Sequence, residues 1–481
     1  MEGLREKILS GLFWTYAERT LAQLISLIVT IVLTRMVMPD EYGVISIATV
    51  FITLADTFAT NSFANALIQK KDCDNIDYST VFYFNIFFSA VIYFLIFFLA
   101  KPIASFYYMD KLCVILRVMA IRIPIASINS VQQAYVSKTY QFKKFFYATL
   151  GGTIISAFLG IFVAYLGYGV WALVIQYLSN VLVDTLVLWF TVKWRPNLEF
   201  SFSRMRVLYS FGWKILVTSL LINVYSNIQD LIIGKKFSPS DLAYSNKGRQ
   251  FPSLIASNIN TSLNKVLFPI LSDKQDSTEY IKKITRKSIG LGTFLLAPLL
   301  LGLAAVGKPF VEIILTHNWL PCVPYLRIMC VVFLLQPIQT SSVQAFNALG
   351  RSDIYLRLEI IKKVFGVIVL TVSVFCYSSV VAIFIGCLLA EFFSTAANMP
   401  FNKKYFNYTY YEQMVDIVPS FLLAVVMYLL ITIFESLNST WNLYILFGME
   451  ILIGVVFYIV FSVVLRNKNL IYIINLLKLR T

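Results

Sequence analysis

Charged residues are scarce in this sequence. Only 14% of its 481 residues are Asp, Glu, Lys or Arg, whereas 58% are hydrophobic. Soluble domains carry about 25% charged and about 45–50% apolar residues. A water-soluble fold of this composition would have to bury nearly every residue, which surface-to-volume scaling does not allow. The shortage of charge therefore excludes a soluble protein and predicts one whose solvent is the lipid bilayer.

Residue types that build catalytic and metal sites are also few. The sole histidine, His317, has no triad or metal partners, and the six cysteines show no CxxC spacing. Residues 302–308 fit GxxxxGK, but Pro309 replaces the Ser or Thr that would hold Mg²⁺. No loop is long enough for a soluble catalytic domain. We therefore expect no enzyme activity, no cofactor and no metal site.

Apolar segments of membrane-spanning length recur along the chain. Runs such as 81–100, 148–166 and 443–465 contain almost no charge, and about 20 residues are needed to cross about 30 Å of hydrocarbon. Residues 1–10 lead straight into the first segment without a small-residue cleavage site, so we expect no cleavable signal peptide. We predict an all-α integral membrane protein with about 14 transmembrane helices. The predicted spans are 11–34, 42–66, 79–100, 112–136, 145–166, 168–192, 209–234, 240–270, 284–306, 321–348, 355–377, 380–400, 413–434 and 442–465.

The distribution of Lys and Arg predicts the orientation. An even number of spans puts both termini on one side, where 24 basic residues lie in or beside the loops, against 6 on the other side. Cytoplasmic loops carry an excess of Lys and Arg, so we predict that both termini are cytoplasmic. The net charge of +15 does not indicate a nucleic-acid partner, because no soluble domain is there to carry a basic patch.

The two halves of the chain resemble each other at offsets of 199 to 211 residues. KPI at residue 101 and LRVM at residue 116 return as KPF at 308 and LRIM at 326, while Trp14 and Gln133 return as Trp213 and Gln344. Each half holds six spans, so the repeat is parallel and its axis lies along the membrane normal, an architecture of transporters. We predict two parallel-repeat six-helix lobes around a central cavity, plus two C-terminal helices. The predicted divisions are residues 1–200, 201–405 and 406–481.

Polar side chains follow one helical face in four predicted spans, 11–34, 42–66, 209–234 and 240–270. By the repeat, the first two spans correspond to the last two. Such faces are costly in lipid, so they either hydrogen-bond between helices or line a hydrated cavity. A shared central cavity explains all four faces at once. We predict that its polar lining includes Asn223, Asn227, Gln250 and Asn264.

Ten basic residues lie inside the predicted spans, where each costs at least about 2.5–3.5 kcal/mol at mid-bilayer. Lysines near span ends reach the interface by snorkelling. Arg117 and Arg122 are about 140° apart around a helix. Both can contact one ligand group only if the helix is kinked between them, and Pro124 is the candidate for causing that kink. Arginine suits phosphate because its fork donates two parallel hydrogen bonds. The predicted substrate-binding cations of the cavity are Arg19, Arg117, Arg122, Lys247, Arg249 and Arg327. The buried acids are predicted either to couple ions or to compensate these cations; they are Glu18, Asp56, Asp184, Asp230 and Glu391.

Several segments resemble the polysaccharide flippases of the multidrug/oligosaccharidyl-lipid/polysaccharide (MOP) exporter superfamily. Residues 243–247 read AYSNK where family members tend to read GYYNR, which keeps the charge at Lys247. The resemblance covers nearly the whole chain. It rests on ALIQKKD at 66–72, GYGVWAL at 167–173, LIIGK at 231–235, LFPILS at 267–272, WLPCVP at 319–324 and GRSD at 350–353.

The resemblance implies a two-lobed helical flippase of the bacterial inner membrane that serves lipopolysaccharide, O-antigen or exopolysaccharide biosynthesis. It would move an undecaprenyl-diphosphate-linked oligosaccharide repeat unit from the cytoplasmic to the periplasmic leaflet by alternating access. The implied partners are the lipid-linked oligosaccharide, membrane lipids and other polysaccharide-assembly membrane proteins. Two alternatives stay open. A multidrug/ion antiporter of the same superfamily would want an acidic, aromatic-rich cavity, and a membrane-embedded glycan ligase or polymerase would need a larger extracytoplasmic loop.

Overall fold

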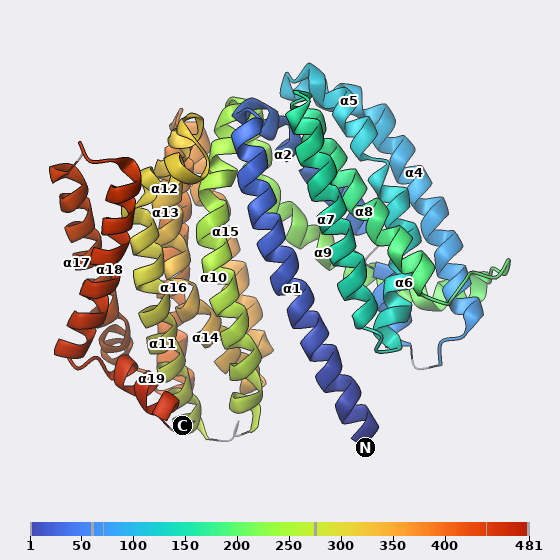
Figure 1. Cartoon of the computed structure of the whole chain (residues 1–481). Helices are drawn as coiled ribbons and strands as arrows, with labels where there is room; N and C mark the ends of the chain where they lie inside the picture. Colours follow the sequence, from blue (N-terminus) through green and yellow to red (C-terminus); the bar gives the residue numbers. More distant parts are fainter. Residues whose placement is uncertain (1, 59–61, 71, 274–276, 439, 479–481) are drawn as a thin grey trace. The chain divides into compact units, whose positions relative to one another are not determined.

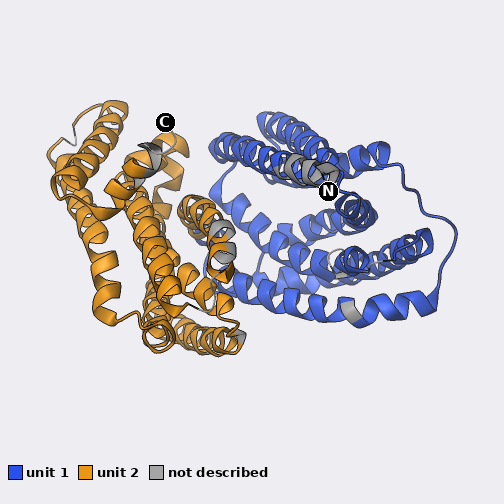
Figure 2. Ribbon diagram, turned by 90° about the horizontal axis from the view of Figure 1, so that it is seen from below, with its two compact units in different colours: residues 1–243 blue, residues 244–481 orange. Residues whose placement is uncertain are grey.

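The structure is a computed structural model that describes residues 2–58, 62–70, 72–273, 277–438 and 440–478. All regular structure within these ranges is helical (Figure 1). The chain forms two compact units, residues 1–243 and 244–481 (Figure 2). The predicted all-α class is confirmed, whereas the three-part division at residues 200 and 405 stays a prediction.

Unit 1 contains the helices up to α9 and the start of α10. Helix ends are set by local chemistry: Asp74 and Asp77 form a capping box at the start of α4, and Tyr108 ends α4 in the left-handed conformation, with φ 57°. The helices are α1 (Glu2–Met36), α2 (Pro39–Asp56), α3 (Ser62–Gln69), α4 (Asn75–Tyr107), α5 (Asp110–Met119), α6 (Arg122–Lys138), α7 (Lys143–Tyr165), α8 (Val170–Thr191) and α9 (Phe202–Lys236).

Unit 2 contains most of α10 and the helices that follow it. Its core includes the large side chains of Trp319, Phe346, Phe384 and Tyr408, all with under 2% exposure. The helices are α10 (Pro239–Asp273), α11 (Thr278–Ala305), α12 (Gly307–Ile314), the 3₁₀ helix η2 (His317–Cys322), α13 (Val323–Leu334), α14 (Gln336–Ala348), α15 (Ser352–Cys376), α16 (Val380–Phe406), α17 (Tyr410–Leu437), α18 (Leu443–Val464) and α19 (Lys468–Lys478).

The outer faces of the helices are apolar. Phe98, Phe158, Phe190 and Phe375 are each 70–83% exposed, which soluble surfaces rarely tolerate in such numbers. Among the described residues, eleven helices are long and apolar enough to cross a membrane, and they coincide with eleven of the predicted spans. The other three predicted spans, 42–66, 240–270 and 355–377, are occupied by the shorter or more polar α2 with α3, α10 and α15. The count of 14 therefore stays a prediction.

The fourth predicted span of each half is interrupted at a similar place. Residues 112–136 divide into α5 and α6 at residues 120–121, and residues 321–348 divide into α13 and α14 at Leu335. A kink was predicted at Pro124, whereas the helix break lies just before it, and Pro124 itself occupies the first turn of α6. Proline is tolerated there because the amide groups of a first turn have no intrahelical acceptor.

Small residues let α7 and α8 approach closely. Gly152, Ser156, Gly160 and Ala164 are buried along one face of α7. A β-carbon at Gly152 would lie 2.9 Å from the carbonyl oxygen of Asn180, and one at Gly160 would lie 2.9 Å from the β-carbon of Gln176. This pattern is typical of membrane helix pairs whose backbones pack without large side chains between them.

Candidate functional site

A polar cavity of about 420 Å³ lies within unit 1. It is enclosed by residues of α2, α3, α6, α8 and α9, all of which belong to the same unit. A polar cavity among helices with apolar outer faces is where membrane proteins place substrate and ion sites. The lining residues are Thr53, Asp56, Thr57, Ala64, Arg122, Ala126, Asn129, Ser130, Gln133, Asn180, Val181, Asp184 and Asn223.

An ion pair between α2 and α6 forms part of the cavity wall. Arg122 Nη1 lies 2.7 Å from Asp56 Oδ2, and the two side chains are 25% and 15% exposed. The same nitrogen donates to the hydroxyl of Tyr177 at 2.6 Å, and the guanidinium lies 4.4 Å from the centre of that ring. Asp56 and Arg122 were predicted from the sequence as separate site residues. The structure brings them together and holds the guanidinium at the cavity.

Amide and carboxylate side chains line the rest of the cavity. Asn129 Nδ2 donates to Asp184 Oδ2 at 2.6 Å, and Asn223 Nδ2 donates to Thr57 Oγ1 at 2.8 Å. Asn223 was predicted to line a cavity, and Asp184 was one of the predicted buried acids, whereas Asn129 was not among the predicted site residues. The signal for Asn129 in the sequence is the polar segment 127–133 of α6.

The repeat-related arginines Arg117 and Arg327 bind backbone rather than each other or the pair above. Arg117 Nε donates to the carbonyl of Phe97 at 3.2 Å, and Arg327 Nε donates to that of Ala304 at 3.0 Å. Each carbonyl lies five residues before a proline of the repeated Lys-Pro motif, Pro102 or Pro309. The two contacts are therefore equivalent anchors. Their predicted role as substrate-binding cations remains a prediction.

The other predicted residues of unit 1 lie on α1 and α9. Glu18 Oε1 accepts from Thr149 Oγ1 at 2.9 Å, while the neighbouring Arg19 is exposed. Asn227 Nδ2 donates to the carbonyl of Asn223 at 2.8 Å, and Asp230 is 9% exposed. These residues do not line the 420 Å³ cavity. Their predicted roles in a central cavity stay predictions.

The other predicted cations and cavity amides of unit 2 lie on α10. Lys247 is 7% exposed, and its Nζ lies 3.2 Å from Gln250 Oε1 and 5.8 Å from the centre of the Trp319 ring. One guanidinium nitrogen of Arg249 lies 3.3 Å from Asn246 Oδ1. Further along α10, Asn264 Oδ1 accepts from Gln344 Nε2 at 3.0 Å. Asn264 thus joins the second half of α10 to α14.

Unit 2 places a neutral pair near the position of the ion pair of unit 1. Asn260 Nδ2 donates to Gln336 Oε1 at 2.8 Å, from α10 to α14. By the repeat offsets of 200 and 210 residues, these amides lie four residues past the equivalents of Asp56 and Arg122. Four residues are about one helical turn. Each unit therefore joins its second and fourth spans through polar side chains, but only unit 1 uses charges for this pair.

Known proteins match the chain over most of its length. Residues 32–324 match the family described as "Polysaccharide biosynthesis protein". The lipopolysaccharide biosynthesis protein WzxC of Escherichia coli (strain K12) is 24% identical over 366 residues, which cover 75% of this chain and 73% of WzxC. The teichuronic acid biosynthesis protein TuaB of Bacillus subtilis (strain 168) is 25% identical over 362 residues, which cover 74% of each chain.

Solved structures share the fold. The lipid II flippase MurJ in an inward closed conformation superposes with a TM-score of 0.75 at 13% identity, over 95% of this chain and 99% of MurJ. An inward-facing multidrug resistance MATE family transporter of the MOP superfamily gives a TM-score of 0.63 at 15% identity, over 80% of this chain and 94% of the transporter. At these identities the likeness establishes the fold alone. The predicted family is confirmed: the chain belongs to the polysaccharide biosynthesis protein family, and it shares its fold with MurJ and with the MATE family transporter.

Proposed function

We propose that the chain is a flippase that moves a lipid-linked oligosaccharide repeat unit from the cytoplasmic to the periplasmic leaflet of a bacterial inner membrane. The proposed cargo is linked through undecaprenyl diphosphate. Family membership supports this reading, as do relatives named for lipopolysaccharide and teichuronic acid biosynthesis and a structural neighbour named as a lipid II flippase. The observation that carries it is the polar cavity with Arg122 in its wall, inside a unit whose outer faces are apolar.

Arg122, which lines the cavity together with Asp56 and Asp184, is the group that suits an anionic headgroup that must leave water. A diphosphate loses its hydration in the membrane and needs donors in its place. Arg122 supplies a charged fork that Asp56 and Tyr177 already orient. When Asp56 takes up a proton or a cation, its hold on Arg122 weakens, and the guanidinium becomes available to a phosphate. This exchange would couple cargo binding to an ion.

The remaining parts of the proposal concern the whole molecule. Two parallel-repeat lobes alternate access to a central cavity, to which the cations and polar residues predicted on α1, α9 and α10 contribute. Both termini lie in the cytoplasm, and the chain acts as a transporter without catalysing a reaction.

The test is made in the strain that carries the gene. Deletion should abolish surface polysaccharide and cause the lipid-linked unit to accumulate in the cytoplasmic leaflet. Arg122→Gln should fail to restore export, whereas Arg206→Gln, which removes an exposed cation outside the cavity, should restore it. Normal polysaccharide with altered drug resistance would instead identify an antiporter. Complete repeat units stranded on the outer leaflet would identify a ligase.

A further inference from the structure

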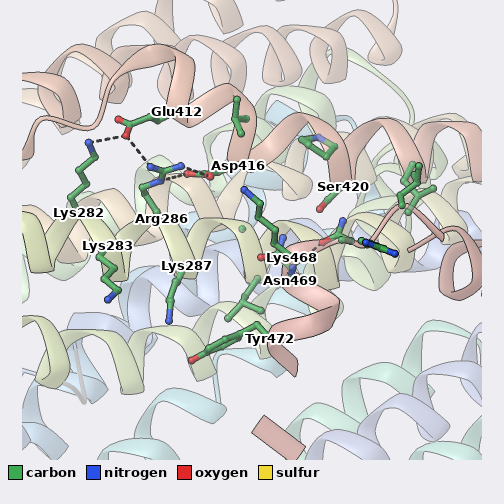
Figure 3. A pocket seen from close by; sticks show the side chains of 18 of the residues that line it. Lys282, Lys283, Arg286, Lys287, Glu412, Asp416, Ser420, Lys468, Asn469 and Tyr472 are labelled. Atoms are coloured by element: carbon green, nitrogen blue, oxygen red, sulfur yellow. Dashed lines mark hydrogen bonds and ion pairs between the residues drawn. The ribbon is translucent and has the colours of Figure 1, made fainter. Parts of the chain in front are cut away.

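A second cavity, of about 760 Å³, lies within unit 2 and is lined by an unusual number of cations (Figure 3). It is formed by the start of α11, the start of α17, the turn after α18 and the start of α19. Three acids line it, Glu279, Glu412 and Asp416. The lining cations are Lys282, Lys283, Arg286, Lys287, Arg466 and Lys468.

The cations of α11 lie in two stripes, one with Lys282 and Arg286 and the other with Lys283 and Lys287. Carboxylates form ion pairs with the first stripe. In the first stripe, Lys282 Nζ lies 2.8 Å from Glu412 Oε1, and Arg286 makes contacts of 2.8 and 3.0 Å with the two oxygens of Asp416. In the second stripe, Lys283 and Lys287 extend away from those carboxylates (Figure 3). Neither of these two lysines forms an ion pair among the described residues. Like charges four residues apart on a helix repel each other.

The turn after α18 adds two further cations at some conformational cost. Arg466 has φ 48° and makes the Schellman pair of hydrogen bonds, its own amide to the carbonyl of Val463 and the Asn467 amide to that of Ser462. Glycine is the usual residue at this position, because a β-carbon is strained there. Lys468 follows at once. Neither Arg466 nor Lys468 has a carboxylate partner within the part of the chain that the structure describes.

Helix α19 has the character of a helix that lies on a membrane surface. It follows the last predicted span, carries Lys468 at its start, and exposes Ile471 and Ile474 by 45% and 40%. Cations beside exposed apolar residues on one short helix favour the boundary between headgroups and acyl chains. Its start is held against α11, where a β-carbon at Gly290 would lie 2.9 Å from Asn469 Oδ1. The cations without a carboxylate partner therefore lie where a lipid headgroup can reach them.

We propose that this cavity binds the phosphate headgroup of an acidic phospholipid, with Lys283, Lys287, Arg466 and Lys468 as the groups that neutralise it. Lys287 is directed by the ring of Tyr472, whose centre lies 4.5 Å from its Nζ. The apolar side chains of Pro419 and Leu423 at the cavity wall give the first acyl carbons a matching surface. The site is independent of the proposed transport cavity in unit 1.

The experiment is native mass spectrometry of the full chain in detergent with equal amounts of phosphatidylglycerol and phosphatidylcholine. The wild-type protein should retain phosphatidylglycerol selectively. Lys287→Gln/Lys468→Gln should weaken that binding about tenfold or more, given the attraction of each cation to an anionic lipid surface. The matched control is Lys403→Gln/Lys404→Gln, which removes two cations of α16 that also lie over tyrosine rings but do not line the cavity. The control should bind phosphatidylglycerol like the wild type.

A second variant guards against misfolding of the first. Arg466→Gly removes a cation and at the same time relieves the left-handed backbone, so it should fold at least as well and still bind phosphatidylglycerol several-fold more weakly. Equal loss in the control pair, or no lipid preference in the wild type, would overturn the proposal. Displacement of the lipid by millimolar inorganic phosphate would also overturn it, because the site would then recognise a free anion.

Discussion

Removing one charge of the Asp56–Arg122 pair should destabilise unit 1 more than removing both. The contact of 2.7 Å joins side chains that are only 15% and 25% exposed. Breaking a buried pair by removing one partner costs about 3–5 kcal/mol, because the other charge is left uncompensated. Here the cavity admits water to the remaining charge, so we expect about 2–3 kcal/mol for Asp56→Asn or Arg122→Gln alone.

The double variant Asp56→Asn/Arg122→Gln should recover most of this loss. The double variant leaves two amides and no uncompensated charge, as in unit 2, where Asn260 and Gln336 hydrogen-bond at 2.8 Å. We expect the double variant to lie within about 1 kcal/mol of the wild type. In a thermal-unfolding assay of the purified full chain, each single variant should lose about 4–12 °C and the double variant less than about 4 °C.

Export of surface polysaccharide then separates structure from transport. If Arg122 binds the cargo phosphate, the double variant is stable and still fails to export. Full export by the double variant would show that the pair only joins α2 to α6, and would refute the role given to Arg122. Single variants that unfold at the wild-type temperature would refute the energetic reasoning itself.

Three further outcomes follow from packing, hydrogen bonding and titration. Gly152→Ala should destabilise unit 1 by about 1–3 kcal/mol, because the added β-carbon would lie 2.9 Å from a backbone oxygen. Gly151→Ala should be neutral or slightly stabilising, because the nearest neighbour of its added β-carbon is 3.7 Å away. Thermal unfolding of the two variants tests this difference. Arg117→Met and Arg327→Met should each cost about 1.5–3 kcal/mol for the lost charged hydrogen bond, and unequal unfolding temperatures would show that the two anchors are not equivalent. The pKa of Asp74 is lowered below its usual 3.8 by a hydrogen bond from an arginine of α9, so its contribution to stability is present above about pH 3.8 and fades as the pH falls through the lower folded-state value. The unfolding temperatures of the wild type and Asp74→Asn should therefore differ at pH 7 and approach each other as the pH falls below 3.8. A difference that stays constant as the pH falls would contradict this assignment.

The sequence predicted the fold well because its main signals are local. Charge scarcity, span length and the repeated Lys-Pro and Leu-Arg motifs depend on neighbouring residues alone, and the structure has helices where they placed them. Contacts between side chains of different helices could not be predicted from such local signals. Asp56 and Arg122 are separated by 66 residues, and their contact depends on how α2, α6 and α8 pack. For the same reason Asn129 was missed, and the contact between Asn129 and Asp184 was not predicted although Asp184 was named as a buried acid.

The arginines of the repeat show why a buried cation is an incomplete signal of a binding site. Arg117 and Arg327 were expected to bind substrate because a cation inside a membrane needs a reason. Each of them already has a partner, because it donates a hydrogen bond to a backbone carbonyl that precedes the proline of the repeated Lys-Pro motif. Arg122 differs, because its partners are the side chains of a cavity wall, which can exchange one anion for another. The two units therefore share their anchors and differ in their charged pair, so we expect ion coupling to depend on unit 1 alone. Neutral substitutions at Asn260 and Gln336 should alter stability without changing the ion dependence of export.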